Sequence, residues 1–132
     1  MKRKLFFILS LFLISSIYIF GENFPQKAKT VNDFIPKGWK EILTTNGDLN
    51  RDKLEDTVIV IEKEDKKNIK KNDGFGPEEL NLNPRILLVL FKQKDGTYIL
   101  ASKNDKGFIK SEGNDDNPAL MDTLDDIIIK NN

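Results

Sequence analysis

The segment that decides the fold runs from residue 56 to residue 62 and reads Asp-Thr-Val-Ile-Val-Ile-Glu. Residues 57–61 are all β-branched, and such residues favour extended backbone because a helix restricts their χ1 angles. The last four of them form an unbroken apolar run, which predicts a strand buried on both faces. We therefore expect this segment to be among the most buried parts of the protein.

A second apolar run, Arg-Ile-Leu-Leu-Val-Leu-Phe-Lys, spans residues 85–92 directly after Pro84. The sequence Lys-Asp-Gly-Thr follows at residues 94–97, and Asp-Gly between apolar segments is a strong signal for a β-hairpin. We expect a tight turn there and an antiparallel return strand at residues 98–102. The run at 85–92 should be as buried as the first one.

Two further strands and one short turn complete the expected elements. Residues 39–45 are rich in Trp, Ile, Leu and Thr, although their alternation is imperfect for a strand. The triplet Ile127-Ile128-Ile129 predicts a last strand at residues 127–130. Residues 31–35 suit a short helical turn capped by Thr30. The sequence therefore predicts a mainly β fold, a small antiparallel β-meander with little helix.

The N-terminal residues have the pattern of an export signal. A basic head, Lys2-Arg3-Lys4, precedes an apolar stretch at residues 5–20, which is shorter than the roughly 20 residues that an upright membrane-spanning helix needs. The sequence predicts a signal peptide at residues 1–21, cleaved after Gly21, and a protein located in the periplasm or outside the cell. The alternative is that this segment is not cleaved and anchors the protein to a membrane, which would be the only membrane contact that we expect.

The remaining 111 of the 132 residues are enough for one domain. We expect residues 22–36 to form a flexible leader with the short turn, and residues 37–132 to form a single β-rich domain. The charged run at residues 63–67 suits a solvated hairpin tip. Because little chain follows the isoleucine triplet, we expect either a chain shortened at its C-terminus or a last strand that adds to a sheet edge.

Composition narrows the possible chemistry, because the chain contains no cysteine and no histidine. Disulfides, thiolate nucleophiles and zinc–thiolate sites are excluded, and the commonest general base is missing. A metal site would have to use oxygen ligands, which favours calcium or magnesium. Without the basic head, 18 basic and 21 acidic residues leave a net charge of −3, so we expect no nucleic-acid partner. The sequence does not indicate whether the protein binds another protein or a glycan.

One loop carries a spacing with chemical meaning, between the expected strands at 39–45 and 56–62. It reads Asp-Leu-Asn-Arg-Asp-Lys-Leu-Glu-Asp from residue 48 to residue 56. Side-chain oxygens fall at its first, third, fifth and ninth positions, and the seventh offers a backbone carbonyl. Calcium takes 6 to 8 oxygen ligands in flexible geometry, which such a loop and water can supply. The candidate ligands are Asp48, Asn50, Asp52, Leu54 and Asp56.

The pattern Asp-x-Asn-x-Asp-x-x-x-Asp resembles the calcium loop of FG-GAP/VCBS-type repeats, in which the loop joins two β-strands. Gly47 before the loop and the apolar strand after it agree with this resemblance, which covers about 20 residues. The resemblance implies a calcium-loop-like connection in the meander. It does not imply the β-propeller of the family, because a single unit cannot close a propeller.

Lys53 stands where this loop usually has a glycine with left-handed backbone. A non-glycine residue there costs roughly 1–2 kcal/mol, and its charge lies near the site, so we expect weak calcium affinity, on the order of 10⁻⁴ to 10⁻³ M. The alternative is a carboxylate-rich turn whose side chains bond the loop's own amides. A looser acidic tract has no fixed spacing and suits a solvated loop; its members are Glu112, Asp115, Asp116, Asp122, Asp125 and Asp126.

These features favour an exported, non-enzymatic β-rich domain with a structural calcium loop, serving as a binding or envelope-associated module. One alternative is a small carboxylate-dependent hydrolase, which would show a concave pocket that gathers acidic residues away from residues 48–56. Another is a degenerate or truncated protein that retains no activity.

Overall fold

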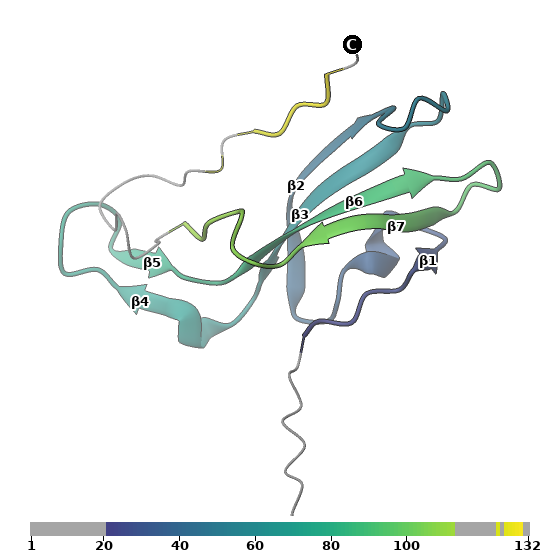
Figure 1. Cartoon of the computed structure of the whole chain (residues 1–132). Coiled ribbons are helices and arrows are strands. Elements are labelled where there is room, and N and C mark those ends of the chain that lie inside the picture. The colour runs from purple at the N-terminus through teal and green to yellow at the C-terminus, as the bar shows by residue number, and fades with distance from the viewer. Residues whose placement is uncertain (1–20, 113–123, 125, 131–132) are drawn as a thin grey trace, which may run out of the picture.

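The computed structural model describes residues 21–112, 124 and 126–130, and it shows a mainly β fold (Figure 1). Five strands form one antiparallel sheet in the order β1-β7-β6-β3-β2, and two short strands, β4 and β5, pair separately. The strands are β1 (Lys27–Ala28), β2 (Trp39–Gly47), β3 (Asp56–Lys63), β4 (Ile69–Lys71), β5 (Glu79–Asn81), β6 (Arg85–Lys92) and β7 (Tyr98–Asn104). The helical elements of the described residues are two short 3₁₀ turns, η1 (Val31–Phe34) and η2 (Lys66–Asn68). The predicted fold class is confirmed.

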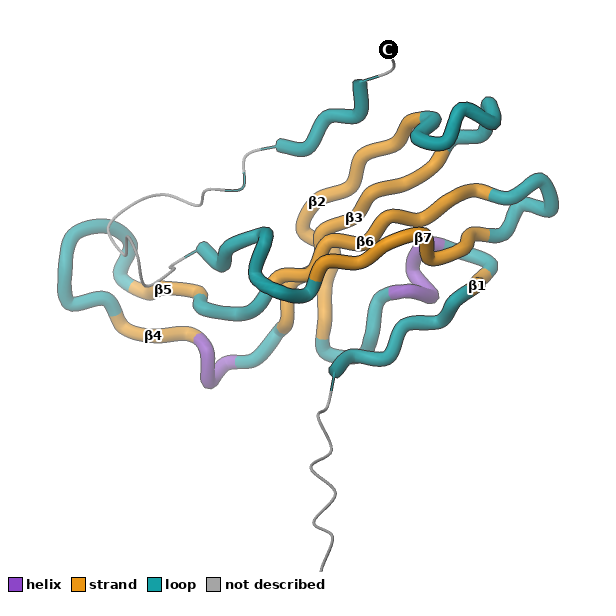
Figure 2. The backbone as a smooth tube through the Cα atoms, viewed as in Figure 1, coloured by secondary structure: helices purple, strands orange, loops and turns teal. Residues whose placement is uncertain are grey.

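Strands β2, β3, β6 and β7 form the predicted meander, with the β4–β5 hairpin inserted between β3 and β6 (Figure 2). The turn between β6 and β7 lies where the Asp-Gly sequence predicted it, and Gly96 supplies the positive φ of 84° that this turn requires. A register shift between Glu41 and Leu43 interrupts the β2–β3 ladder. This bulge explains the imperfect alternation of the β2 sequence.

Strand β3 is buried along nearly its whole length, as its apolar run predicts. Alternate residues of a strand point to opposite faces, so Ile59 and Ile61 point to one face, here called the first face. The main core lies on that face, where Phe34 of η1 is fully buried. Its buried members are Phe34, Trp39, Ile59, Ile61, Ile86, Leu88 and Leu90.

The opposite face of the sheet, here called the second face, is also apolar. Val58 and Val60 point to it and are 6% and 0% exposed. Their cross-strand partners Thr45, Leu43, Val89 and Leu87 share this face and are half-buried. The sheet therefore separates two apolar layers, as the burial of β3 on both faces requires.

The segment before β2 belongs to the folded structure, which corrects the expectation of a flexible leader at residues 22–30. Strand β1 pairs with β7, and Phe24 and Ala28 pack against the core of the first face. The short turn predicted after Thr30 is present as η1, and Asp33 accepts bonds from the backbone and hydroxyl of Thr30. These bonds hold the pKa of Asp33 below its ordinary value.

Two other expectations differ from the structure. The charged run at residues 63–67 is not a hairpin tip, because Lys63 ends β3 and η2 leads into β4, so that the hairpin tip falls at residues 72–78. Residues 126–130, where a last strand was expected, have no strand assignment. Residues 1–20 of the signal peptide predicted at residues 1–21 lie outside the described residues. Within the described part of the chain, no helix has the length and apolarity needed to span a membrane.

Candidate functional site

The predicted loop connects β2 to β3 and projects from one end of the sheet (Figure 1). Gly47 and Asp56 are paired across the two strands, so they form the base of the loop. Residues 49–53 are exposed to solvent, whereas Asp56 is fully buried. A rigid sheet thus supports a short solvated loop that is rich in oxygen side chains.

Three of the predicted ligand residues are linked by hydrogen bonds within the loop. Asp48 Oδ1 and Asn50 Oδ1 each accept a bond from the amide nitrogen of Asp52, both at 3.1 Å. The Asn50 amide nitrogen also donates to Asp52 Oδ2 at 3.0 Å. Asp48 and Asn50 thus share a donor, and Asn50 also bonds to the Asp52 carboxylate, so the three side chains form one cluster.

The carboxylates of this cluster also accept bonds from the following amides. Asp48 Oδ2 accepts from the Lys53 amide at 2.9 Å, and Asp52 Oδ1 accepts from the Leu54 amide at 2.8 Å. These are the side-chain-to-backbone bonds that a carboxylate-rich turn makes on its own. These bonds tie the side chains of the loop to its own backbone.

Asp56, the ninth residue of the pattern, has a different environment. Its side chain is fully buried, and its two oxygens accept bonds from the amides of Leu49 and Lys92, both at 2.9 Å. One bond fixes the start of the loop, and the other ties the loop base to β6, which lies beside β3 in the sheet. Asp56 therefore acts as a structural anchor between the loop and two strands.

The loop backbone has two residues in the left-handed region. Lys53 has a φ of 68°, as its position in the pattern predicted, and Arg51 has a φ of 63°. Left-handed backbone at a residue with a Cβ is unfavourable by roughly 1–2 kcal/mol. The bonds from Asp48, Asn50 and Asp52 offset this cost, because they hold the backbone in the shape that both residues require.

Among the described residues, no group of three or more acidic side chains has the arrangement of a metal site. The loop cluster contains two carboxylates and one amide oxygen, and the carboxylate of Asp56 is directed at backbone amides. Beside the loop lies an open depression of about 370 Å³, lined by Asp52, Leu54, Lys92, Gln93, Lys94 and Asp95. The surface next to the cluster is therefore concave and carries both acidic and basic side chains.

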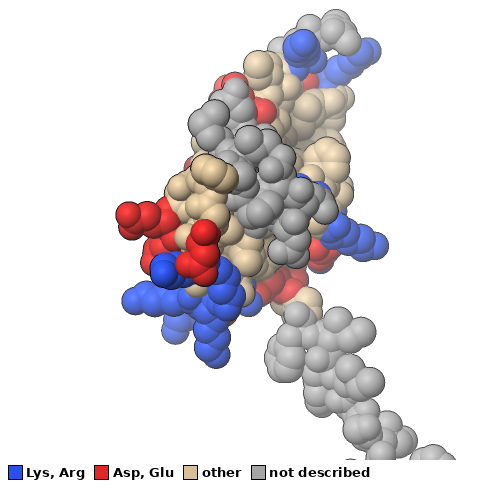
Figure 3. Space-filling view, turned by 90° about the vertical axis from the view of Figure 1, so that its left-hand side faces the viewer, with Lys and Arg blue, Asp and Glu red and all other residues tan. Residues whose placement is uncertain are grey.

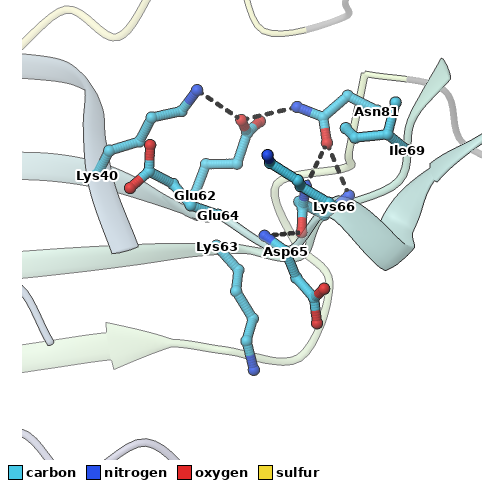
Figure 4. A pocket seen from close by; sticks show the side chains of 9 residues that line it. Lys40, Glu62, Lys63, Glu64, Asp65, Lys66, Ile69 and Asn81 are labelled. Atoms are coloured by element: carbon cyan, nitrogen blue, oxygen red, sulfur yellow. Dashed lines mark hydrogen bonds and ion pairs between the residues drawn. The ribbon is translucent and has the colours of Figure 1, made fainter. Parts of the chain in front are cut away.

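A second concave region, which the sequence did not indicate, lies where the β4–β5 hairpin leaves the sheet (Figure 4). Its volume is about 360 Å³, and three carboxylates and three lysines line it together with Ile69, Asn81 and Asn83. Glu62 is buried there at 3% exposure and accepts from Arg85 Nε at 2.9 Å and from Asn81 at 2.8 Å. Lys40 lies 3.5 Å from the same carboxylate. Both oxygens of Glu62 are thus occupied.

Asn83 completes this polar network and fixes the hairpin. Its side-chain oxygen accepts from the Asp65 amide and from the Asn68 side chain, and its nitrogen donates to Asn81. Asn83 is 3% exposed, so these bonds replace the water that its amide would otherwise bind. The bonds of Asn83 therefore join the hairpin to the sheet. Figure 3 shows basic and acidic side chains side by side at this end of the molecule.

The signal for this network was present in the sequence as polar residues at the ends of apolar runs. Glu62 ends the run in β3 and Arg85 begins the run in β6, and the two are cross-strand partners. Of the acidic tract proposed from the sequence, Glu112 and Asp126 fall among the described residues, and the other four members lie outside them.

No protein-family model matches the chain, and no match to it was found among curated proteins or solved structures.

Proposed function

We propose that the loop from Asp48 to Asp56 is a weak structural calcium site in an exported, non-enzymatic β-rich domain. The observation that carries this proposal is that Asp48 Oδ1 and Asn50 Oδ1 both accept from the Asp52 amide, while the Asn50 side chain donates to Asp52 Oδ2, which places three oxygen-bearing side chains together at a solvated surface. Oxygen ligands and loop geometry suit a hard cation such as calcium.

The hydrogen bonds within the loop leave lone pairs on the side-chain oxygens that can bind a cation. A carboxylate has about four lone-pair sites and an amide oxygen has two, whereas each oxygen of Asp48 and Asp52 accepts one of the bonds described above. The loop carries four acidic and two basic side chains, so a cation would reduce its net negative charge. The amide bonds support the proposal by holding the oxygens in place before an ion arrives.

The affinity should be low, in the range of about 10⁻⁴ to 10⁻³ M that is typical of extracellular modules. Lys53 and Arg51 bring positive charge to the loop, and the buried Asp56 already uses both oxygens on backbone amides. The basic and apolar pattern of residues 2–20 supports export to a compartment where calcium reaches such concentrations. There the loop would stabilise a binding or envelope-associated module.

Thermal unfolding of residues 22–132 in calcium and in chelator tests this proposal. Calcium at a hundredfold excess over the dissociation constant should stabilise the fold by about 2.7 kcal/mol through mass action. The variants Asp48→Asn and Asp52→Asn each keep one of the two acceptor oxygens of the side chain but remove a charge, so each should lose most of this stabilisation. Asp73→Asn is the matched control, because Asp73 is an exposed acid on a distant hairpin.

Lys53→Gly separates a calcium site from a plain turn. The substitution removes backbone strain in both cases, but it removes a nearby positive charge that matters only if a cation binds. Calcium should therefore stabilise the Lys53→Gly variant at lower concentrations than it stabilises the parent protein. Equal melting of the parent in calcium and in chelator would show that the loop is only a turn.

The second candidate function is the carboxylate-dependent hydrolase, which the concave region at the β4–β5 hairpin favours because it gathers Glu62, Glu64 and Asp65. Glu62 is neutralised by Arg85 there, so Glu64 would have to serve as the acid or base. Hydrolysis of a panel of glycosides that is lost in the Glu64→Gln variant would favour this function over the first.

A further inference from the structure

The C-terminal isoleucine segment touches the sheet at a glycine. A Cβ atom placed on Gly47 would lie 2.7 Å from Cγ2 and 3.0 Å from Cβ of Ile129, closer than side-chain atoms tolerate. Gly47 ends β2 and has no positive φ, so its backbone does not require glycine. The requirement is the close approach of Ile129, which is a known reason for glycine in a strand.

Residues 126–130 have no strand pairing in the described structure, and the contact with Gly47 is made by the side chain of Ile129. Ile127 and Ile129 are half-buried, whereas Ile128 between them is 68% exposed, which is the alternation of an extended segment lying on a surface. Residues 126–130 have no strand assignment, and the hydrogen bond described for them is the local one from the Ile127 amide to Asp126. A segment attached in this way opens more easily than a strand of the sheet.

The surface under this segment is the second face of the sheet. Gly47 pairs with Asp56, and Asp56 shares its face with Val58 and Val60. The opposite end of the same face is contacted by the chain after β7, since Arg85 Nη1 donates to the Lys110 carbonyl at 3.0 Å. Figures 1 and 2 show the C-terminal segment beside the upper part of β2. Two described contacts therefore lie at the two ends of one apolar face.

We propose that the second face is a docking surface for an extended, isoleucine-bearing segment, and that its occupant is residues 126–130 of the same chain. Gly47 is the notch that receives Ile129, while the apolar side chains of β2, β3 and β6 form the rest of the surface. The attached segment covers this surface at the high effective concentration of an intramolecular contact. A segment of the same chemistry binds when the attached one is released.

Disulfide trapping tests the occupant directly, because the chain has no cysteine and each introduced thiol is unique. Gly47→Cys combined with Ile129→Cys should form a disulfide within one chain under mild oxidant, because the Cβ positions are close enough for a disulfide after a small shift. Gly47→Cys combined with Ile128→Cys and Ile129→Ala is the matched control, because Ile129→Ala gives the side chain at position 47 similar room; it should react at least about tenfold more slowly because Ile128 points outward. Intact mass distinguishes the products.

Three results of the trapping experiment would overturn the proposal. Equal rates for the two cysteine pairs would show that Ile129 has no preferred position. A cross-link between two chains would assign the surface to a second copy of the protein. No cross-link would show that the segment does not dock at Gly47.

Peptide binding tests the docking surface separately from the attached segment. A fluorescent synthetic peptide with the sequence of residues 126–130 should bind the Ile129→Asp variant, in which the attached segment is released, at least about tenfold more tightly than it binds the parent. Ile128→Asp adds the same charge at an exposed position and should behave as the parent does. Equal peptide binding by all three proteins, or binding by none, would contradict a docking surface of this kind.

Discussion

Gly47 and Asp56 are partners across the β2–β3 ladder at the base of the loop, and they have different structural roles there. Gly47 leaves space for Ile129 on the second face, whereas Asp56 binds the amides of Leu49 and Lys92 from a fully buried position. The loop that carries the proposed calcium ligands thus starts and ends at fixed points. A loop held in this way loses less conformational entropy when it binds an ion.

Asp56→Asn should destabilise the protein by about 1–3 kcal/mol, whether calcium is present or not. The substitution keeps the shape of the side chain but turns one acceptor into a donor, so one of the two amides bound to the buried Asp56 side chain loses its partner. Chemical denaturation in calcium and in chelator measures the effect. Destabilisation that appears only in calcium would instead make Asp56 a metal ligand.

Phe34→Ala should destabilise the protein by about 3–5 kcal/mol, the usual cost of removing a buried aromatic side chain. Phe34 is 0% exposed in the core of the first face, and it lies in the short turn of the segment 22–36 that the sequence separated from the β-rich domain. Phe75→Ala is the control, since Phe75 is 90% exposed, and it should change stability by less than about 0.5 kcal/mol. Similar effects of the two substitutions would place residues 22–36 outside the folded domain.

The Glu62–Arg85 pair should show strong non-additivity. Arg85→Met leaves the buried carboxylate of Glu62 with fewer partners, which typically costs about 3–5 kcal/mol. The double variant Glu62→Met, Arg85→Met should be less destabilised than the sum of the two single variants by at least about 1 kcal/mol. Denaturant unfolding of the four proteins gives the coupling energy. Additive effects would mean that the two side chains act independently.

Asp95 should contribute to the free energy of unfolding at neutral pH, and this contribution should be lost at acidic pH. Bonds from the hydroxyl of Thr97 and from Lys27 hold the pKa of Asp95 well below its usual range. A lowered folded-state pKa gives stability that is present above the unfolded value of about 3.9 and is lost as the pH falls below it. The stability difference between the parent and Asp95→Asn should therefore shrink from pH 6 to pH 2. A constant difference over this range would rule out the proposed contribution.

Local patterns in the sequence predicted the parts of the fold that local physics controls. The β-branched run of β3 and the apolar run of β6 specify buried strands, the Asp-Gly pair specifies the turn between β6 and β7, and Thr30 precedes a short 3₁₀ turn. Each of these signals lies within a few residues of the structure that it determines. The same holds for the left-handed backbone at Lys53, which the loop pattern indicated.

The parts that were missed depend on contacts between distant residues. Strand β1 has two residues and forms because it pairs with β7, about 70 residues later in the chain. The isoleucine triplet has strand propensity, yet the structure places it against Gly47 as an unpaired segment on the sheet face. The loop spacing likewise indicated which oxygens cluster, but it did not reveal that Asp56 turns toward the amide of Lys92.

An NMR titration of the ¹⁵N-labelled protein with calcium tests the central proposal most directly. The amides of Asp52, Lys53 and Leu54 donate to the side-chain oxygens that would hold the ion, so their resonances should shift with calcium and return with chelator. The amide of Gly74, which donates to Asn72 in the β4–β5 hairpin, should not move. Loop resonances that stay in place at millimolar calcium, or that move no more than the resonance of Gly74, would contradict a calcium site between Asp48 and Asp56.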